Sequence, residues 1–146
     1  MSTIASTSFY QYRPLRYPDS VRILRLAPSP NFDDPIHCTL GTYRLSDPKL
    51  KFEPLSYTWG DARDVERVFI GGDRAPLCVT RNCFNALKSL RRHNTARSLW
   101  IDAICIGQSD AAERSAQVQI MKRCLHQGLA DSHLPRRGNQ RHRVAV

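Results

Sequence analysis

One carboxylate inside an apolar run, and a second soon after it, are the side chains of this sequence best placed for chemistry. Asp102 is the only charged residue between Leu99 and Ile106, and Glu113 follows that run. A carboxylate in a buried segment must be hydrogen-bonded, paired with a cation or functional. At the carboxyl end of a strand, Asp102 would lie where ligands bind in open α/β sheets. The alternative is that Asp102 accepts backbone or indole N–H bonds and holds loops together.

Polar side chains gather around Gly60, at the end of another expected strand. Ser56, Tyr57 and Asp61 could line the same crevice as Asp102 if the two strands end at one edge of the sheet. Asp61 has a simpler reading, because aspartate beside glycine commonly closes a turn.

Two tryptophans and one cysteine complete the candidates. The indoles of Trp59 and Trp100 could stack on a flat ring such as a nucleobase or nicotinamide, but core packing with a satisfied N–H is the more usual role. Cys105 lies in the apolar run with no histidine near it in sequence, so we expect no nucleophilic role for it.

The apolar run also dictates the elements around it. Residues 98–106 are long, apolar and bounded by Gly107, which predicts a central strand buried on both faces as in a parallel sheet. A helix should follow, capped by Asp110 with Glu113 in capping-box position, which is the structural alternative to a chemical role for Glu113. Its buried face is expected to hold Val118, Met121 and Leu125, and Gly128 should end it.

The first half of the chain reads as strands. Residues 1–19 contain tyrosines and prolines without a sustained period, which predicts an extended lead-in whose aromatic side chains pack back on the domain. Residues 21–26 and 36–45 should pair as an antiparallel edge hairpin. A further strand is expected over 52–61.

A second hairpin and a helix come next. Val65–Ile70 alternates and reaches a glycine turn, so a strand over 77–79 should return beside it. Thr80 or Asn82 can cap the helix that follows. Its inner face should carry Phe84, Leu87 and Leu90.

Composition narrows the class of protein. The 146 residues suit one domain, and the net charge of +9 comes partly from residues 123–146, where five arginines face one aspartate. Such a basic tail is more often solvated than bound to nucleic acid, so a nucleic-acid partner is not expected.

Five scattered cysteines without a Cys-x-x-Cys pair indicate reduced core thiols, and five histidines without paired spacing indicate no metal site. No stretch resembles a membrane span or a secretory signal, which favours a location inside the cell.

Several blocks, in this order, strongly resemble the heterokaryon-incompatibility (HET) domain of filamentous fungi. They are Leu55–Asp61, Val79–Asn82, Leu99–Ile106, Glu113–Arg114 and Gln117–Met121. The resemblance covers roughly residues 20–125, within a HET domain predicted over 20–127. It implies an α/β fold, a TIR-like (flavodoxin-like) doubly wound sheet preceded by an antiparallel hairpin. It also implies a cytoplasmic protein of fungal non-self recognition, which starts programmed cell death through protein partners or self-association.

The same resemblance supplies an enzymatic alternative. Some TIR relatives cleave NAD with a catalytic glutamate, which would make Glu113 the catalytic residue and Asp102 a second candidate. Trp59, Asp61 and Ser56 would then line the pocket, with NAD as substrate and no bound cofactor. Fold alone does not choose between hydrolysis and signalling.

Two departures from the family pattern suggest a third possibility. Gly107 stands where members usually have asparagine, and residues 128–146 form an irregular basic tail where members continue into a strand of the type Val-x-x-Trp-Leu-Gly. We therefore expect the sheet to be incomplete at its C-terminal end, and the chain to be a truncated, non-functional fragment if that tail is a genuine product.

Overall fold

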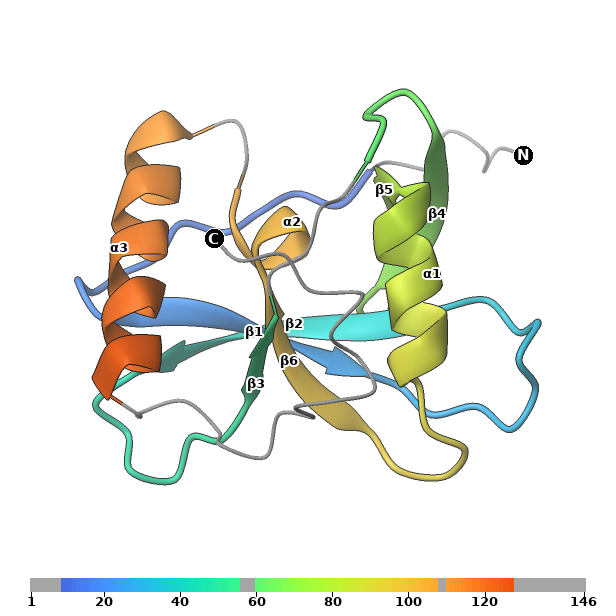
Figure 1. Ribbon diagram of the computed structural model, residues 1–146, viewed down its shortest axis with the longest axis horizontal. Helices are drawn as coiled ribbons and strands as arrows, with labels where there is room; N and C mark the ends of the chain where they lie inside the picture. The colour runs from blue at the N-terminus through green and yellow to red at the C-terminus, as the bar shows by residue number, and fades with distance from the viewer. Residues whose placement is uncertain (1–8, 56–59, 108–109, 128–146) are drawn as a thin grey trace.

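The structure, a computed structural model, describes residues 9–55, 60–107 and 110–127. These residues form an α/β fold with one mixed sheet, as Figure 1 shows. In chain order the elements are β1 (Ser20–Leu26), β2 (His37–Arg44), β3 (Glu53–Leu55), β4 (Val65–Ile70), β5 (Ala75–Thr80), α1 (Arg81–Leu90), β6 (Arg97–Ile101), α2 (Asp102–Cys105) and α3 (Ala111–Gln127).

The six strands of the described chain lie in the order β3-β6-β1-β2-β4-β5. β3 is parallel to β6 and β2 is parallel to β4, while the other neighbouring pairs are antiparallel. The predicted α/β class is confirmed. So is the antiparallel pairing of β1 with β2, but the prediction that this hairpin lies at an edge was wrong. β1 buries residues on both faces, so it is an interior strand with β6 on its other side.

The apolar run does not continue as one strand. β6 ends at Ile101, and Asp102 begins the short helix α2 instead of lying within the strand as predicted. Both shapes bury the run, because the helical turn folds Ile104 and Cys105 back into the core, where they are fully buried. A short apolar segment therefore does not distinguish a strand from a strand followed by a turn of helix.

The two longer helices lie on opposite sides of β3 and β6 (Figure 1). α1 begins as predicted at Thr80, whose hydroxyl accepts a hydrogen bond from the backbone N–H of Cys83 (3.2 Å). Leu87 and Leu90 are buried, while Phe84 is only half-buried against the core. α3 begins after Asp110, whose carboxylate accepts from the backbone N–H of Glu113 (3.0 Å), as predicted.

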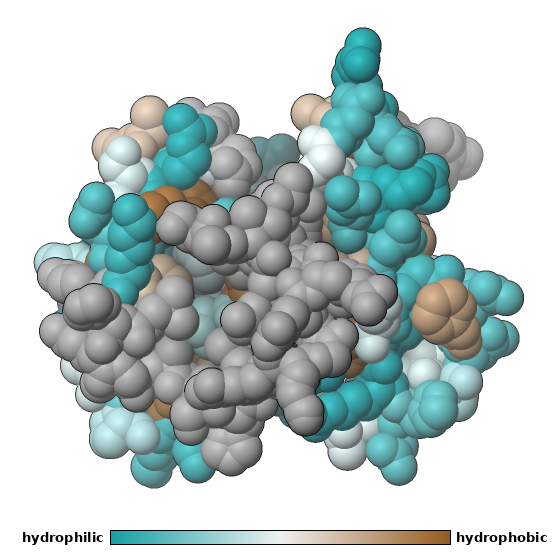
Figure 2. Space-filling model, viewed as in Figure 1, coloured by the Kyte–Doolittle hydropathy of each residue, from teal (hydrophilic) through white to brown (hydrophobic). Residues whose placement is uncertain are grey.

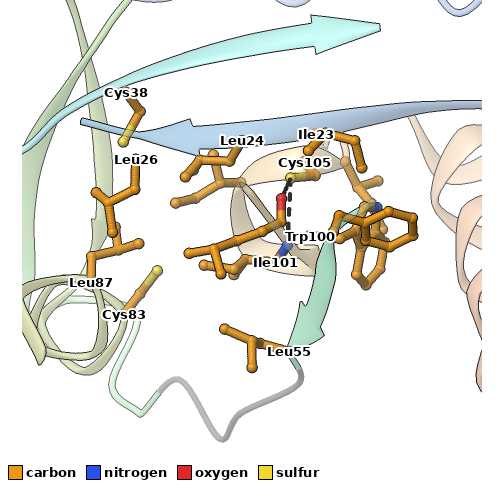
Figure 3. Packing of buried hydrophobic residues seen from close by; sticks show 14 of the residues in the cluster. Ile23, Leu24, Leu26, Cys38, Leu55, Cys83, Leu87, Trp100, Ile101 and Cys105 are labelled. Carbon is orange, nitrogen blue, oxygen red and sulfur yellow. Dashed lines mark hydrogen bonds between the residues drawn. The ribbon is translucent and has the colours of Figure 1, made fainter. Parts of the chain in front are cut away.

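The core has two sides, separated by the strands. In the close view of Figure 3, Leu24 and Ile101 lie toward Leu87 of α1, whereas Ile23 and Trp100 lie on the side of α3. This division follows from the alternation of side chains along a strand. α3 contributes Ile120 and Met121 to the core and presents a half-buried Val118; the side chain of Leu125 lies outside the described part.

The remaining strand predictions are met in part. β4 and β5 form the predicted hairpin through the turn at Gly71, whose carbonyl accepts from the backbone N–H of Arg74 (3.1 Å). β3 covers only Glu53–Leu55 of the strand expected over 52–61, and residues 56–59 lie outside the described chain. The predicted helix end at Gly128 and the expected tail lie outside it as well.

The lead-in packs back on the domain, as its tyrosines predicted. The backbone N–H of Tyr10 donates to the carbonyl of Pro76 (2.9 Å), and its side chain packs against the core. The Tyr12 hydroxyl donates to the carbonyl of Ile104 in α2 (2.6 Å). The lead-in therefore links the β4–β5 hairpin to α2.

The surface in the view of Figure 2 is mainly hydrophilic over α1 and the β4–β5 hairpin, with apolar colour in small patches. Within the described ranges, no helix combines the length and the apolar character needed to cross a bilayer.

Candidate functional site

A buried ion pair joins Arg22, the third residue of β1, to Glu113 in the first turn of α3. Arg22 has the same parity in β1 as Leu24 and Leu26, so the alternation of the strand places its long side chain on an inward face. Glu113 is the third residue of α3 and lies in its first turn. The Arg22 side chain is 3% exposed and that of Glu113 is 13% exposed. A buried guanidinium requires such a partner, because an unpaired buried charge is very costly.

The contact between these two side chains is bidentate. Arg22 Nη1 lies 2.5 Å from Glu113 Oε2, and Nη2 donates to Oε1 over 3.2 Å. Nη1 also donates to the carbonyl of Cys105 (3.1 Å), and Nη2 to the carbonyl of Arg13 (2.6 Å). One guanidinium thus connects β1, α2, α3 and the lead-in.

The carboxylate of Glu113 is equally engaged. Besides the two bonds from Arg22, its Oε2 accepts the backbone N–H of Gly107 (2.7 Å). Burial by itself would raise the pKa of Glu113, but the hydrogen bonds from Arg22 and Gly107 outweigh it and hold the pKa below its ordinary value. The group is therefore ionised at neutral pH and acts as an acceptor.

The capping-box prediction for Glu113 was half right. Asp110 does cap α3, but the Glu113 side chain bonds to Gly107 and Arg22, and the backbone N–H of Asp110 donates to the carbonyl of Gly107 (3.1 Å). Glu113 bonds to Arg22 instead of the backbone N–H of Asp110 because a guanidinium offers a charge-assisted bidentate contact, which a single backbone N–H does not.

Tyr12 closes the site from the lead-in. Its ring centroid lies 4.9 Å from Cζ of Arg22, a cation–π distance, while its hydroxyl bonds to Ile104. Burial raises the pKa of Tyr12 above its ordinary value, so the hydroxyl remains a donor.

Asp102 is the first residue of α2, the helix to which Tyr12 and Arg22 donate hydrogen bonds, and it is half-buried. The burial that raises the pKa of Cys105 to about 12 is reinforced by the negative charge of Asp102. Cys83 has its pKa raised by burial and by Asp102 in the same way. These two thiols are therefore protonated at neutral pH.

The residues expected around Gly60 are only partly described. Asp61 is exposed, and its carboxylate accepts the backbone N–H of Arg63 (2.9 Å) while facing the Arg63 guanidinium. Its carbonyl accepts from the backbone N–H of Asp64 (3.1 Å), so Asp61 closes a turn as its simpler reading predicted. Ser56, Tyr57 and Trp59 lie outside the described residues.

Trp100 is a core residue, 4% exposed, with an indole N–H that has no hydrogen-bond partner in the described part of the chain. Of the cysteines, Cys38, Cys83 and Cys105 are buried as predicted, but Cys78 is exposed on β5. Among the described side chains, no three histidine, cysteine or acidic groups lie close enough together to hold a metal.

Sequence reasoning missed Arg22, the central residue of this site. The sequence did hold a signal, because Arg22 lies two residues before Leu24 in β1 and its side chain therefore lies on the same face of the strand. It also missed Gln117 of α3, which is buried and donates through Nε2 to the carbonyl of Ser20 (2.9 Å). A polar residue at an inward position of an amphipathic element is the pattern that marks both.

Comparison with known proteins connects this fold to a family. The family model described as Heterokaryon incompatibility protein (HET) matches residues 52–129, from β3 to the end of α3. A curated relative is "Heterokaryon incompatibility protein 6, OR allele" of Neurospora crassa, 31% identical over 134 residues. That alignment covers 82% of this chain and 20% of the relative, so the chain spans about one fifth of the length of the curated relative it matches. No solved structure shows significant similarity to it. Because the matched residues make up more than half of the sequence, this chain belongs to the heterokaryon incompatibility (HET) family.

Proposed function

We propose that this chain carries the signalling domain of a fungal heterokaryon-incompatibility protein, acting in non-self recognition and programmed cell death. The observation that carries the proposal is the family match over residues 52–129, together with the Neurospora crassa relative of that name. In this proposal the domain acts in the cytoplasm, through contacts with protein partners or with further copies of itself.

The geometry of the Arg22–Glu113 pair supports a signalling role over NAD hydrolysis. A carboxylate that accepts three hydrogen bonds from the protein has little capacity left to attack or stabilise a sugar carbon. Catalysis by Glu113 or Asp102, and a pocket formed with Trp59, Asp61 and Ser56, stay predictions.

The finer fold assignment belongs to the same proposal. A TIR-like, flavodoxin-like sheet is supported by the parallel pairs β3–β6 and β2–β4 and by helices on both sides of β3 and β6. Three of the five neighbouring pairs in the described sheet, β1–β2, β1–β6 and β4–β5, are antiparallel and depart from an all-parallel sheet.

The test is inducible expression of the whole chain in a filamentous fungus, with death scored by uptake of a membrane-impermeant dye. We expect death with the natural chain and with Asp102→Ala, and survival with Leu24→Asp, which places a charge in the core. Survival of cells that accumulate the folded natural chain would overturn the proposal.

A parallel assay separates the two functions. Purified chain is incubated with NAD below its unfolding temperature, and NAD is measured over time. We expect no consumption; consumption that Glu113→Gln abolishes in a variant still folded at that temperature would establish the hydrolase instead.

A further inference from the structure

The edge of β2 becomes open where β4 leaves it. β2 pairs with β4 only through His37 and Cys38, and in Figure 1 the β4–β5 hairpin turns away from the rest of β2. β2 then continues to Arg44 with β1 on one side. In the described chain, no strand pairs with the other side of residues 39–44.

The register decides which backbone groups face this open side. The carbonyl of His37 accepts from Ala27 and the backbone N–H of Leu45 donates to Asp19, so the odd-numbered residues of β2 bond to β1. Antiparallel ladders alternate, and the even-numbered residues therefore point their N–H and C=O groups outward. Leu40 and Thr42 present such groups side by side, which is the template for an added strand.

A cleft of about 1240 Å³ lies against this edge. Residues 39–42 of β2 line one side, residues 9–14 of the lead-in another, and the turn of the β4–β5 hairpin a third. A residue in a sheet occupies roughly 160 Å³, from a rise of about 3.3 Å, a strand spacing of about 4.8 Å and a sheet thickness of about 10 Å. The cleft therefore has room for a short extended segment.

The charges that line the cleft are mainly positive. Arg13, Arg22 and Arg74 face a single acidic residue, Asp73. Arg22 is paired with Glu113, but within the described residues neither Arg13 nor Arg74 takes part in a salt bridge. This excess favours an occupant with acidic side chains. It also disfavours residues 123–146 of the same chain, which are rich in arginine.

We propose that the cleft beside Leu40 and Thr42 binds an extended acidic peptide segment of a partner protein, which adds a strand to the open edge of β2. This inference deepens the proposed function by naming what the partner presents. Its test in solution does not depend on cell death, so either idea can fail without the other.

The experiment uses the whole chain and a fluorescent peptide of alternating threonine and glutamate, with binding followed by anisotropy. We expect saturable binding, at least about tenfold weaker binding of a threonine–lysine peptide, and none of a threonine–glutamate peptide N-methylated at every residue, which has no N–H left on either edge. Hydrogen exchange should show added protection at the amides of Leu40 and Thr42 when the acidic peptide is bound.

Variants of the chain locate the site. Thr42→Pro removes an outward N–H and should abolish binding, whereas Thr42→Val keeps it and should bind normally. Arg74→Glu should weaken binding about tenfold, while Arg92→Glu, the same charge change outside the cleft, should have little effect. If Thr42→Pro does not fold, the N-methylated peptide makes the same distinction on the natural chain.

Three results would overturn the proposal. Equal binding of the N-methylated peptide would exclude strand addition. Full competition by inorganic phosphate at equal concentration would indicate a site for small anions. Dimers in sedimentation that Thr42→Pro converts to monomers would make the occupant a second copy of this chain.

Discussion

Arg22 and Glu113 are 91 residues apart in sequence and form a bidentate ion pair at 2.5 and 3.2 Å, with both side chains largely withdrawn from solvent. Through the other bonds of the guanidinium, the pair also joins α2 and the lead-in to β1. Its first role is therefore to fix how the N-terminal third of the chain meets α3.

Removing one partner should destabilise the fold strongly. Glu113→Ala leaves the Arg22 guanidinium buried without a counter-charge, and breaking a buried pair in this way costs about 3–5 kcal/mol. Urea denaturation measures the loss. Asp64→Asn is the control, since the Asp64–Arg81 pair is exposed and should be worth less than about 1 kcal/mol. If Glu113→Ala and Asp64→Asn cost the same, the pair does not hold the fold together.

The stability should depend on pH through Glu113. Its pKa lies below the ordinary value of 4.5, so its contribution is complete above that pH and is lost as the pH falls through the folded-state pKa. The difference in unfolding free energy between the natural chain and Glu113→Gln should therefore be constant near neutrality and shrink in acid. Comparing the two chains cancels the other carboxylates. A difference independent of pH would contradict the assignment.

Thiol labelling should single out Cys78 among the described cysteines. Burial raises the pKa of Cys38 to about 12 from an ordinary 9.0, which leaves about a thousandfold less thiolate, and Cys105 is shifted similarly. Brief iodoacetamide treatment of a Cys124→Ser chain, followed by mass spectrometry, should find the label on Cys78, which is exposed. In denaturant all four should react, which is the internal control. Rapid native labelling of Cys38 would show that the β1–β2 side of the core opens readily.

Gly60 should not tolerate a side chain. Its φ is +81°, a left-handed conformation, and a Cβ there would lie 2.6 Å from Nδ2 of Asn82. Gly60→Ala should cost more than about 1 kcal/mol in denaturation. Gly72→Ala is the matched control, because that Cβ would meet nothing within 4 Å and the backbone is not left-handed. Equal stability of the two variants would contradict the turn geometry at Gly60.

The sequence by itself determined the local elements and the family. Alternation predicted the β1–β2 and β4–β5 hairpins, and Thr80 and Asp110 marked the starts of α1 and α3, because these signals act over a few residues. The blocks that resemble the HET domain were equally visible, since they are runs of neighbouring residues.

Only the tertiary structure decided the order of the strands, the end of β6 and the partner of Glu113. The apolar run from Leu99 can be buried as one strand or as a strand followed by the short helix α2. Its pattern therefore could not predict that β6 ends at Ile101. Glu113 had a nearby capping position in sequence, but the fold brings Arg22 to it from 91 residues away. A buried guanidinium must be neutralised by the carboxylate that packing supplies, and no local pattern specifies which one that is.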